Sequence, residues 1–444
     1  MKKILYYIDV RRFSKHQKIH FCLNVSIGIA IVIFFHCVEQ TDWGEANINK
    51  VFDFIIAREA EKSAKSMESL TAQRNVDISD RIIFAEIDHE TYKKWGSPFI
   101  TPREKLAEIV KIAYEGGAKI IAFDILLEDK DCCHPKSDNE LRMIFQDMTE
   151  KNSATKVIFP VRVSYDGKIM GNLCQDLIAK NPNFYASTTN ISASATDRVV
   201  RYWVPFETVQ NDSGNAILWN MSFLIAMLDK GKEKEIKEFE KIMKENMFHK
   251  VHHFKLDHNK VITLSPDRNE IYRNRIRFLL VPQNTLTNYS GGNLFDKVYH
   301  VDEIKHAIVK DKIVIIGNSS PDAGDIHPTP IGNLAGIFII GNAVNTLSLG
   351  LQPSRSPLWL NIMIDVVIVI LAAFIFLYFN SFRAKILSYV VIIPIVGFVS
   401  WFIFLYVGVL LNCIFALMGI INHPMFDNIA EYFKNKGANA DEKS

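Results

Sequence analysis

The chain has 444 residues, of which 48 % are hydrophobic and 11 % aromatic, and its formal net charge is +2. This much apolar material excludes a chain that is disordered throughout, and the balanced charge gives no global signal for nucleic-acid binding. Long apolar runs near both ends, with a large polar segment between them, indicate a membrane protein with a sizeable soluble domain.

The first apolar run predicts a transmembrane helix over residues 19–39. Residues 19–38 contain no Asp, Glu, Lys or Arg, and about 20 such residues cross the hydrocarbon layer of a membrane. A cleaved signal peptide is the alternative. It is disfavoured because the run is longer than the apolar core of such peptides and no A-x-A site follows. Residues 1–18 are rich in Lys and Arg, which predicts a cytoplasmic N-terminus.

The C-terminal part of the chain predicts further spans. The apolar run after residue 386 is too long for one crossing, so we expect a turn near Val407 and four spans in all, with three as the alternative. Arg383 and Lys385 in the polar loop place that loop in the cytoplasm. The predicted segments are spans at 357–379, 386–406 and 408–427 and a short cytoplasmic tail at 428–444.

This topology predicts a multi-pass protein of a bacterial inner membrane. Residues 40–356 would face the periplasm or the cell exterior, and both termini would be cytoplasmic. Asp365 lies inside the second span, where an ionisable side chain is functional by default. Its nearness to the outer interface favours a plainer role, in which it reaches the headgroups or pairs with Arg355.

The external segment begins with signals of an α/β fold. A juxtamembrane helix is expected over 51–73. It is followed by a strand at 81–88, an amphipathic helix that starts after Pro102 and ends at Gly116 or Gly117, and a strand at 118–124. Strand, helix and strand over about 45 residues form a βαβ unit with parallel strands.

The rest of the external segment continues this pattern. Residues 311–350 contain a buried strand, a loop with Asp325, and an apolar helix from about Gly336 to Leu349. We therefore predict one α/β domain with a mostly parallel, helix-flanked sheet. The other predicted elements are strands at 156–164, 197–207 and 275–282, a buried helix at 216–228 and a solvated surface helix at 230–247, with Ile236, Phe239, Met243 and Met247 on one apolar face among its charges.

Three acidic residues stand at or after predicted strand ends. They are Asp88, Asp124 and Asp325. Ligands of parallel α/β sheets bind outside the carboxyl ends of the strands, so these carboxylates could converge on a metal cation or on the polar groups of a ligand. The alternative is that each acid caps a turn or a helix N-terminus, as Asp often does.

Three cysteines lie outside the predicted spans. Cys132 and Cys133 are adjacent, and Cys174 follows later in the chain. An oxidising compartment would permit one bridge, from Cys174 to either member of the pair, so at most one disulfide is expected.

Three stretches carry a resemblance to a known family. RIIFAEIDHETYKKWGSPFITPREKLAEIVKIAYEGGAKIIAFDILLED (81–129) resembles the opening of the second-class CHASE domain, an extracellular sensory module associated with cyclases and histidine kinases. TDRVVRYWVPFE (196–207) resembles its middle segment. KIVIIGNSSPDAGDIHPTPIGNLAGIFIIGNAVNTLSLG (312–350) resembles its closing motif, with Thr329-Pro330 in the expected place. His89 and Ser97-Pro98 depart from the family pattern.

The resemblance implies a sensor that binds a small molecule or an envelope protein. Asp88, Asp124, Asp325 and Thr329 are the candidate ligand-binding residues, and the three acids are also the candidate metal ligands. Family members commonly continue into a cytoplasmic effector, whereas residues 428–444 are too few to form one. We therefore expect a separately encoded effector, with a homo-oligomer possible and no nucleic-acid partner.

Two other functions are compatible with the sequence. The first is a membrane scaffold subunit that contacts a partner through the helix at 230–247 or the tail. The second is a metal-dependent hydrolase that uses Asp88, Asp124 and Asp325. Ser319 follows a strand and a glycine, but Pro321 stands where a nucleophile elbow needs glycine. No catalytic residue and no cofactor are predicted.

Overall fold

The computed structural model describes residues 14–69, 81–128, 135–211, 214–243, 251–257, 260–266, 272–279, 298–300, 306–350, 352–378 and 388–411. The chain forms two compact units. Unit 1 combines Met1–Phe52 with Pro353–Ser444, and unit 2 is Asp53–Gln352.

Unit 2 is built on a six-stranded parallel sheet, which confirms the predicted α/β class. The strand order is β12-β1-β13-β2-β3-β4. These strands are short apolar runs, as expected for a parallel sheet that helices cover on both faces. Their bounds are β1 (Ile82–Ile87), β2 (Ile120–Asp124), β3 (Lys156–Pro160), β4 (Phe184–Ser187), β12 (Val298–His300) and β13 (Ile313–Asn318).

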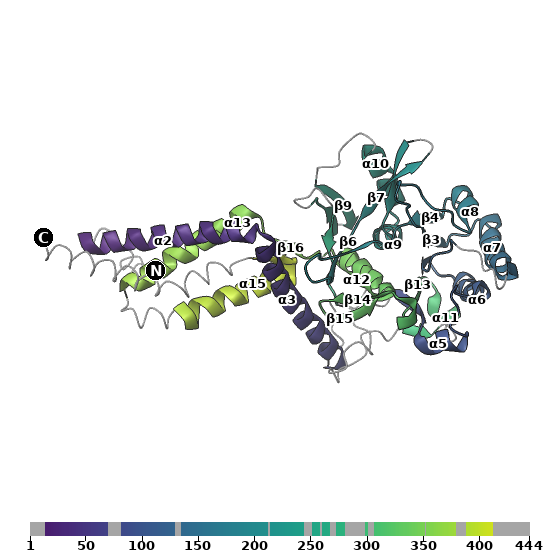
Figure 1. Ribbon diagram of the computed structural model, residues 1–444, viewed down its shortest axis with the longest axis horizontal. Helices are drawn as coiled ribbons and strands as arrows, with labels where there is room; N and C mark the ends of the chain where they lie inside the picture. The colour runs from purple at the N-terminus through teal and green to yellow at the C-terminus, as the bar shows by residue number, and fades with distance from the viewer. Residues whose placement is uncertain are drawn as a thin grey trace. The chain divides into compact units, whose positions relative to one another are not determined.

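Helices cover both faces of this sheet (Figure 1). On one face lie α6 (Arg103–Glu115), α7 (Pro135–Glu150), α8 (Gln175–Lys180) and α11 (His306–Val309). On the other face lie α9 (Met221–Asp229) and α12 (Gly336–Leu349). Successive strand residues pack on opposite faces of the sheet. Ile83 and Phe123 belong to the core under α6 and α7, whereas Phe84 packs on Phe338 of α12 with ring centroids 5.4 Å apart.

The predicted βαβ unit is present, with one difference in strand order. Helix α6 connects β1 to β2, and Gly116 is its C-cap. The two strands are parallel but are not neighbours, because β13 hydrogen-bonds to both of them. A strand more than 180 residues further along the chain therefore occupies the centre of the sheet.

Two predicted elements were wrong in part. Residues 216–228 were expected to be one helix, but the first of them belong to β8 (Gly214–Trp219) and α9 begins only at Met221. The side chain of Asn220 accepts a hydrogen bond from the Ser222 amide and caps α9, so the chain changes from strand to helix at this residue. Of the predicted strand at 275–282, residues 275–279 are described, and among them only Arg275 belongs to a strand, β11 (Asn274–Arg275), which pairs with β6 (Val200–Trp203).

The remaining elements of unit 2 surround this sheet. Helix α10 (Glu233–Met243) packs Ile236 and Phe239 into the interior, where the Phe239 ring lies 5.3 Å from that of Trp219. These two residues belong to the apolar face predicted for this surface helix, and that face packs inside the domain. The others are α5 (His89–Lys94), β5 (Ile191–Ala193), β7 (Phe206–Asn211), β9 (His252–Asp257), β10 (Lys260–Leu264), η3 (Pro321–Ala323), β14 (Ile326–Thr329) and β15 (Gly332–Ala335).

In its described residues, unit 1 contains three helical segments long and apolar enough to cross a membrane. They are Phe21–Glu39, Leu358–Ile375 and Val390–Val407, and they coincide with the first three predicted spans. Most of the predicted fourth span, 408–427, lies outside the described residues. The elements of this unit are α2 (Lys15–Glu39), the start of α3 (Asp42–Ser69), β16 (Ser354–Arg355), α13 (Leu358–Tyr378), the π-helical turn η4 (Ser388–Ile392), α15 (Ile393–Val407) and β17 (Val409–Leu410).

The partner of Asp365 differs from the one expected. Its Oδ2 lies 3.0 Å from Nε2 of His36 on α2, whereas the guanidinium of Arg355 lies 3.4 Å from Oδ1 of Asn49 and 3.7 Å from Glu45. The Asp365 side chain is fully buried, so it does not reach toward a surface as expected.

Cys174 carries a free thiol in this structure. It lies in the core beneath α7 and α8, and burial raises its pKa to about 12. The predicted bridging partners, Cys132 and Cys133, lie outside the described residues. A thiol so deeply buried is a packing group with little thiolate character.

Candidate functional site

The candidate site lies at the carboxyl edge of the parallel sheet, on the face covered by α12. Three residues of neighbouring strands are aligned there: Glu86 of β1 pairs with Gly317 of β13, which pairs with Asp124 of β2. Aligned residues of parallel strands point to the same face, so the two carboxylates flank a glycine. Their strands are second neighbours in the sheet, about 10 Å apart.

Asp325 approaches this row from the loop after β13. The glycine that begins α12 makes room for it: a Cβ at Gly336 would come within 2.1 Å of Oδ2 of Asp325. The backbone amide of Gly336 also donates to the carbonyl of Asp325. The carboxylate therefore lies against the first turn of a 14-residue helix, where the positive end of the helix dipole stabilises negative charge.

Asp124 is the electrostatically unusual member of the site. Its Oδ2 is shielded from solvent and has no hydrogen-bond partner among the described residues. Burial, together with the negative charge of Asp325, raises the pKa of Asp124 well above its usual range. A buried acid next to a second acid is poised to accept a positive charge.

Polar neighbours complete the edge. Nε2 of His327 lies 2.8 Å from Oδ1 of Asp325, and the hydroxyl of Ser319 donates to Glu86. The side chains of Asp325 and His327 are 42 % and 32 % exposed, so this part of the site is open to solvent. The site thus combines a buried acid with an accessible one.

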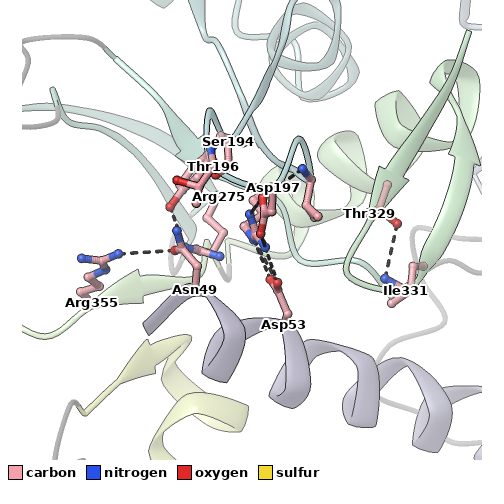
Figure 2. A network of polar contacts seen from close by, with 12 residues as sticks. Asn49, Asp53, Ser194, Thr196, Asp197, Arg275, Thr329, Ile331 and Arg355 are labelled. Atoms are coloured by element: carbon pink, nitrogen blue, oxygen red, sulfur yellow. Dashed lines mark hydrogen bonds and ion pairs between the residues drawn. The ribbon is translucent and has the colours of Figure 1, made fainter. Parts of the chain in front are cut away.

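The other two predicted site residues have structural roles. Oδ1 of Asp88 accepts the amide of Thr91 at 2.8 Å and caps α5. The hydroxyl of Thr329 donates to the carbonyl of Gly332 at 2.6 Å within the β14–β15 turn, and Figure 2 shows its contact with Ile331. The structure thus brings Asp124 and Asp325 together, but not Asp88 or Thr329.

No three-carboxylate metal site is formed. Within the described parts of the chain, no group of three or more His, Cys, Asp or Glu side chains is arranged to hold a metal ion. The hydrolase hypothesis required Asp88, Asp124 and Asp325 to act together, and Oδ1 of Asp88 is used to cap α5.

Glu86 and His327 were missed in the sequence. The signal available for both was their closeness in the sequence to a predicted site acid. Glu86 stands two residues before Asp88, and His327 stands two residues after Asp325. The pattern of acids at or after predicted strand ends did not include either residue.

A second feature of unit 2 is the attachment of α3 through two buried arginines. Arg201 of β6 is 1 % exposed and binds Asp53 of α3 through Nε at 2.9 Å, and it also binds Asp197 through both terminal nitrogens. Figure 2 shows Asp53 and Asp197 within this network. The hydrogen bonds from Arg201 lower the pKa of Asp197 to about 2.

The second arginine, Arg277, is 2 % exposed and donates through Nε to Glu59 of α3 at 2.9 Å. Its backbone is tied to α12: the hydroxyl of Thr346 accepts from the Arg277 amide at 2.9 Å, and Oδ1 of Asn342 accepts from the Leu279 amide at 2.9 Å. Helix α12 therefore contacts the candidate site at its first turn and the α3 attachment at its third.

These observations define a class: an α/β domain with a polar site at the carboxyl edge of its sheet, joined in the chain to apolar helices on both sides. The chain belongs to the CHASE2 domain family, whose model matches residues 26–378. This confirms the family resemblance. Searches of curated proteins and of solved structures gave no match. CHASE2 domains are extracytoplasmic sensory domains.

Proposed function

We propose that unit 2 is a sensory domain that binds a small cationic ligand at the carboxyl edge of its parallel sheet. The observation that carries this proposal is the shielded, unpartnered Oδ2 of Asp124 beside the accessible carboxylate of Asp325. A positively charged ligand would neutralise both acids and supply the missing hydrogen bond. Because no set of three metal-ligating side chains is gathered in the described residues, an organic amine or guanidinium fits the site better than a bare metal ion.

The proposed output runs along α12 to α3. Ligand at Asp325 acts on the first turn of α12, and Thr346 and Asn342 of the same helix hold the segment that carries Arg277. Arg277 binds Glu59 of α3, and α3 directly follows α2, the first candidate span. In our proposal the three apolar helices of unit 1 cross the inner membrane of a bacterium, and the signal reaches an effector in the cytoplasm.

The scaffold alternative gains no support from α10. Its residues Ile236 and Phe239 are 4 % and 5 % exposed because they pack inside the domain. That apolar surface is therefore not available to a partner protein.

Asp124→Asn is the direct test of the ligand site. In the wild type, stability contributed by this group is complete below the ordinary carboxyl pKa and is lost as pH rises toward the raised pKa of the folded state, because the buried site disfavours the charge. The variant removes this loss, so at pH 7 it should melt at a higher temperature than the wild type.

The same variant should lose the response to cations. We would measure melting of the full-length protein in mild detergent with spermidine, arginine, Mg²⁺ and Ca²⁺ as probes. A cation at 100 times its Kd stabilises the wild type by about 2.7 kcal/mol and leaves Asp124→Asn unchanged. Asp147→Asn removes an exposed acid of α7 and should respond like the wild type. An equal response in Asp124→Asn, or none in the wild type, would contradict the proposal.

Thr346→Val tests the path from site to helix. The substitution keeps the shape of the side chain but removes the hydroxyl that bonds the Arg277 amide and carbonyl. We expect the stabilising cation still to bind, while the change in amide hydrogen exchange that it causes in residues 53–61 is lost. Thr149→Val removes a hydroxyl bonded within α7 and should keep that change. A full response of α3 in Thr346→Val would show that the signal takes another route.

A further inference from the structure

An isolated polar cluster lies between the two candidate spans that flank the sensory domain in the chain. His36 and Glu39 stand in the last turn of α2, and Asp365 stands in the second turn of α13. Nδ1 of His36 is 3.0 Å from Oε2 of Glu39, and Nε2 is 3.0 Å from Oδ2 of Asp365. The three residues are 6 %, 5 % and 0 % exposed.

Counting protons gives the charge of this cluster. Neutral imidazole carries one proton and can donate to one carboxylate only; its other nitrogen would then face a carboxylate lone pair. Two hydrogen bonds at 3.0 Å therefore need two protons. Whether the ring is an imidazolium between two carboxylates, or is neutral beside one carboxylic acid, the cluster then carries one net negative charge.

A net charge at this buried position is unfavourable, and protonation of one atom of the cluster can neutralise it. Oδ1 of Asp365 is shielded from solvent and has no hydrogen-bond partner among the described residues. A third proton on this oxygen makes the cluster neutral. Burial of an unpaired charge between apolar helices costs several kcal/mol, so the site favours the loaded, three-proton form.

Among the described residues, the charged groups closest to the cluster along the chain are Asp42 and Glu45 of α3 and Arg355 before α13. Arg355 lies 3.7 Å from Glu45. Helix α15 contains no acidic or basic residue. Away from the cluster, α2 and α13 meet through apolar side chains, as in the Phe21 and Phe374 rings with centroids 4.8 Å apart.

We propose that His36, Glu39 and Asp365 form a proton-binding site between α2 and α13, and that its loaded, neutral form stabilises the pairing of these two spans. Loss of a proton leaves a buried negative charge at their contact and weakens it. Because α2 leads into the sensory domain and α13 follows it, the site gives the membrane part of the protein its own input, independent of the ligand site on unit 2.

The test is an infrared titration of the full-length protein in lipid nanodiscs, which detects protonated carboxyl groups directly. We use an Asp124→Asn background, because that other buried acid also has a raised pKa. There we expect a carboxylic-acid band that persists above the pH at which exposed carboxyl groups lose their protons, that disappears as pH rises further, and that Asp365→Asn removes. In parallel, spin labels are placed at Cys22 and at Leu371→Cys in a background without other cysteines. As pH rises, the distance between the two labels should increase or its distribution should broaden, with the same pH midpoint as the carboxylic-acid band. In Asp365→Asn the distance should not depend on pH.

Glu45→Gln is the matched control, because it removes a nearby acid outside the cluster and should keep both titrations. The measurement in the Asp124→Asn background still tests the proposal if Asp365→Asn fails to fold, because the other buried acid of the site on unit 2 is then absent. Absence of a titrating carboxyl band would overturn the proposal. So would a band whose midpoint shifts with Na⁺ or K⁺ concentration at constant ionic strength, since the occupant would then be a metal cation. A pH-dependent distance that persists in Asp365→Asn would also overturn it.

Discussion

Arg201→Met is expected to lower the free energy of unfolding of unit 2 by about 3–5 kcal/mol, the cost of removing one partner from a buried ion pair. Arg201 is 1 % exposed and is shared by Asp53 and Asp197. Without the guanidinium, two carboxylates face each other with no cation between them. The wild-type contribution of Asp197, whose pKa is lowered to about 2, is present above pH 4 and is lost as pH falls toward 2.

Urea unfolding of the full-length protein in mild detergent, followed by tryptophan fluorescence, would measure this loss. The matched control is Arg142→Met, which removes an arginine that binds the more exposed Asp176 and also donates to the carbonyl of Leu173. Exposed pairs contribute about 1 kcal/mol or less, so this variant should unfold close to the wild type. Equal losses in the two variants would mean that burial does not give the Arg201 network its strength.

Gly341→Ala is the second variant with a large expected effect. A Cβ at this position of α12 would lie 2.3 Å from Cζ of Phe84 on β1. The Phe84 ring is 1 % exposed and packs on Phe338, so it has little room to move. Overpacking of this kind costs about 1–3 kcal/mol, even though alanine favours the helix.

A double variant separates overpacking from other causes. Phe84→Leu alone should be destabilising because it leaves a cavity, but with Gly341→Ala it gives the new methyl group space. We therefore expect the double variant to be more stable than the sum of the two single effects, by about 1 kcal/mol in a double-mutant cycle. Additive effects would place the origin of the loss elsewhere.

The strands were predictable because their residues form short, continuous apolar runs between polar turns. Residues 81–88, 118–124 and 311–318 each have this form, and each is a strand of the parallel sheet. Their order was not predictable, because the apolar pattern of β1 and β2 is the same whether they touch each other or a third strand. The prediction of one helix at 216–228 was wrong for a local reason. The sequence stays apolar through the change from β8 to α9, and only Asn220 marks the position of that change.

Two of the four residues predicted for the site, Asp124 and Asp325, lie together in the candidate site. Their position at strand ends identified Asp124 and Asp325. Asp88 has the same kind of position, but its side chain accepts the amide of Thr91 and caps a helix. Whether a strand-end acid reaches a ligand or a nearby amide depends on the path of the following loop. The His36–Asp365 contact joins residues 329 positions apart, and no local pattern in either span shows it.

The position of β13 bears on how the domain is made. Strand β1 has β12 and β13 as its sheet neighbours, and both are synthesised more than 200 residues after it. Until β13 has been translocated, β1 and β2 present unpaired edges, and the pockets for Phe84 and Asp124 do not exist. If α13 crosses the membrane as proposed, we expect the sheet to close late, at about the time α13 is inserted, so that insertion of this helix and completion of the domain become a single event.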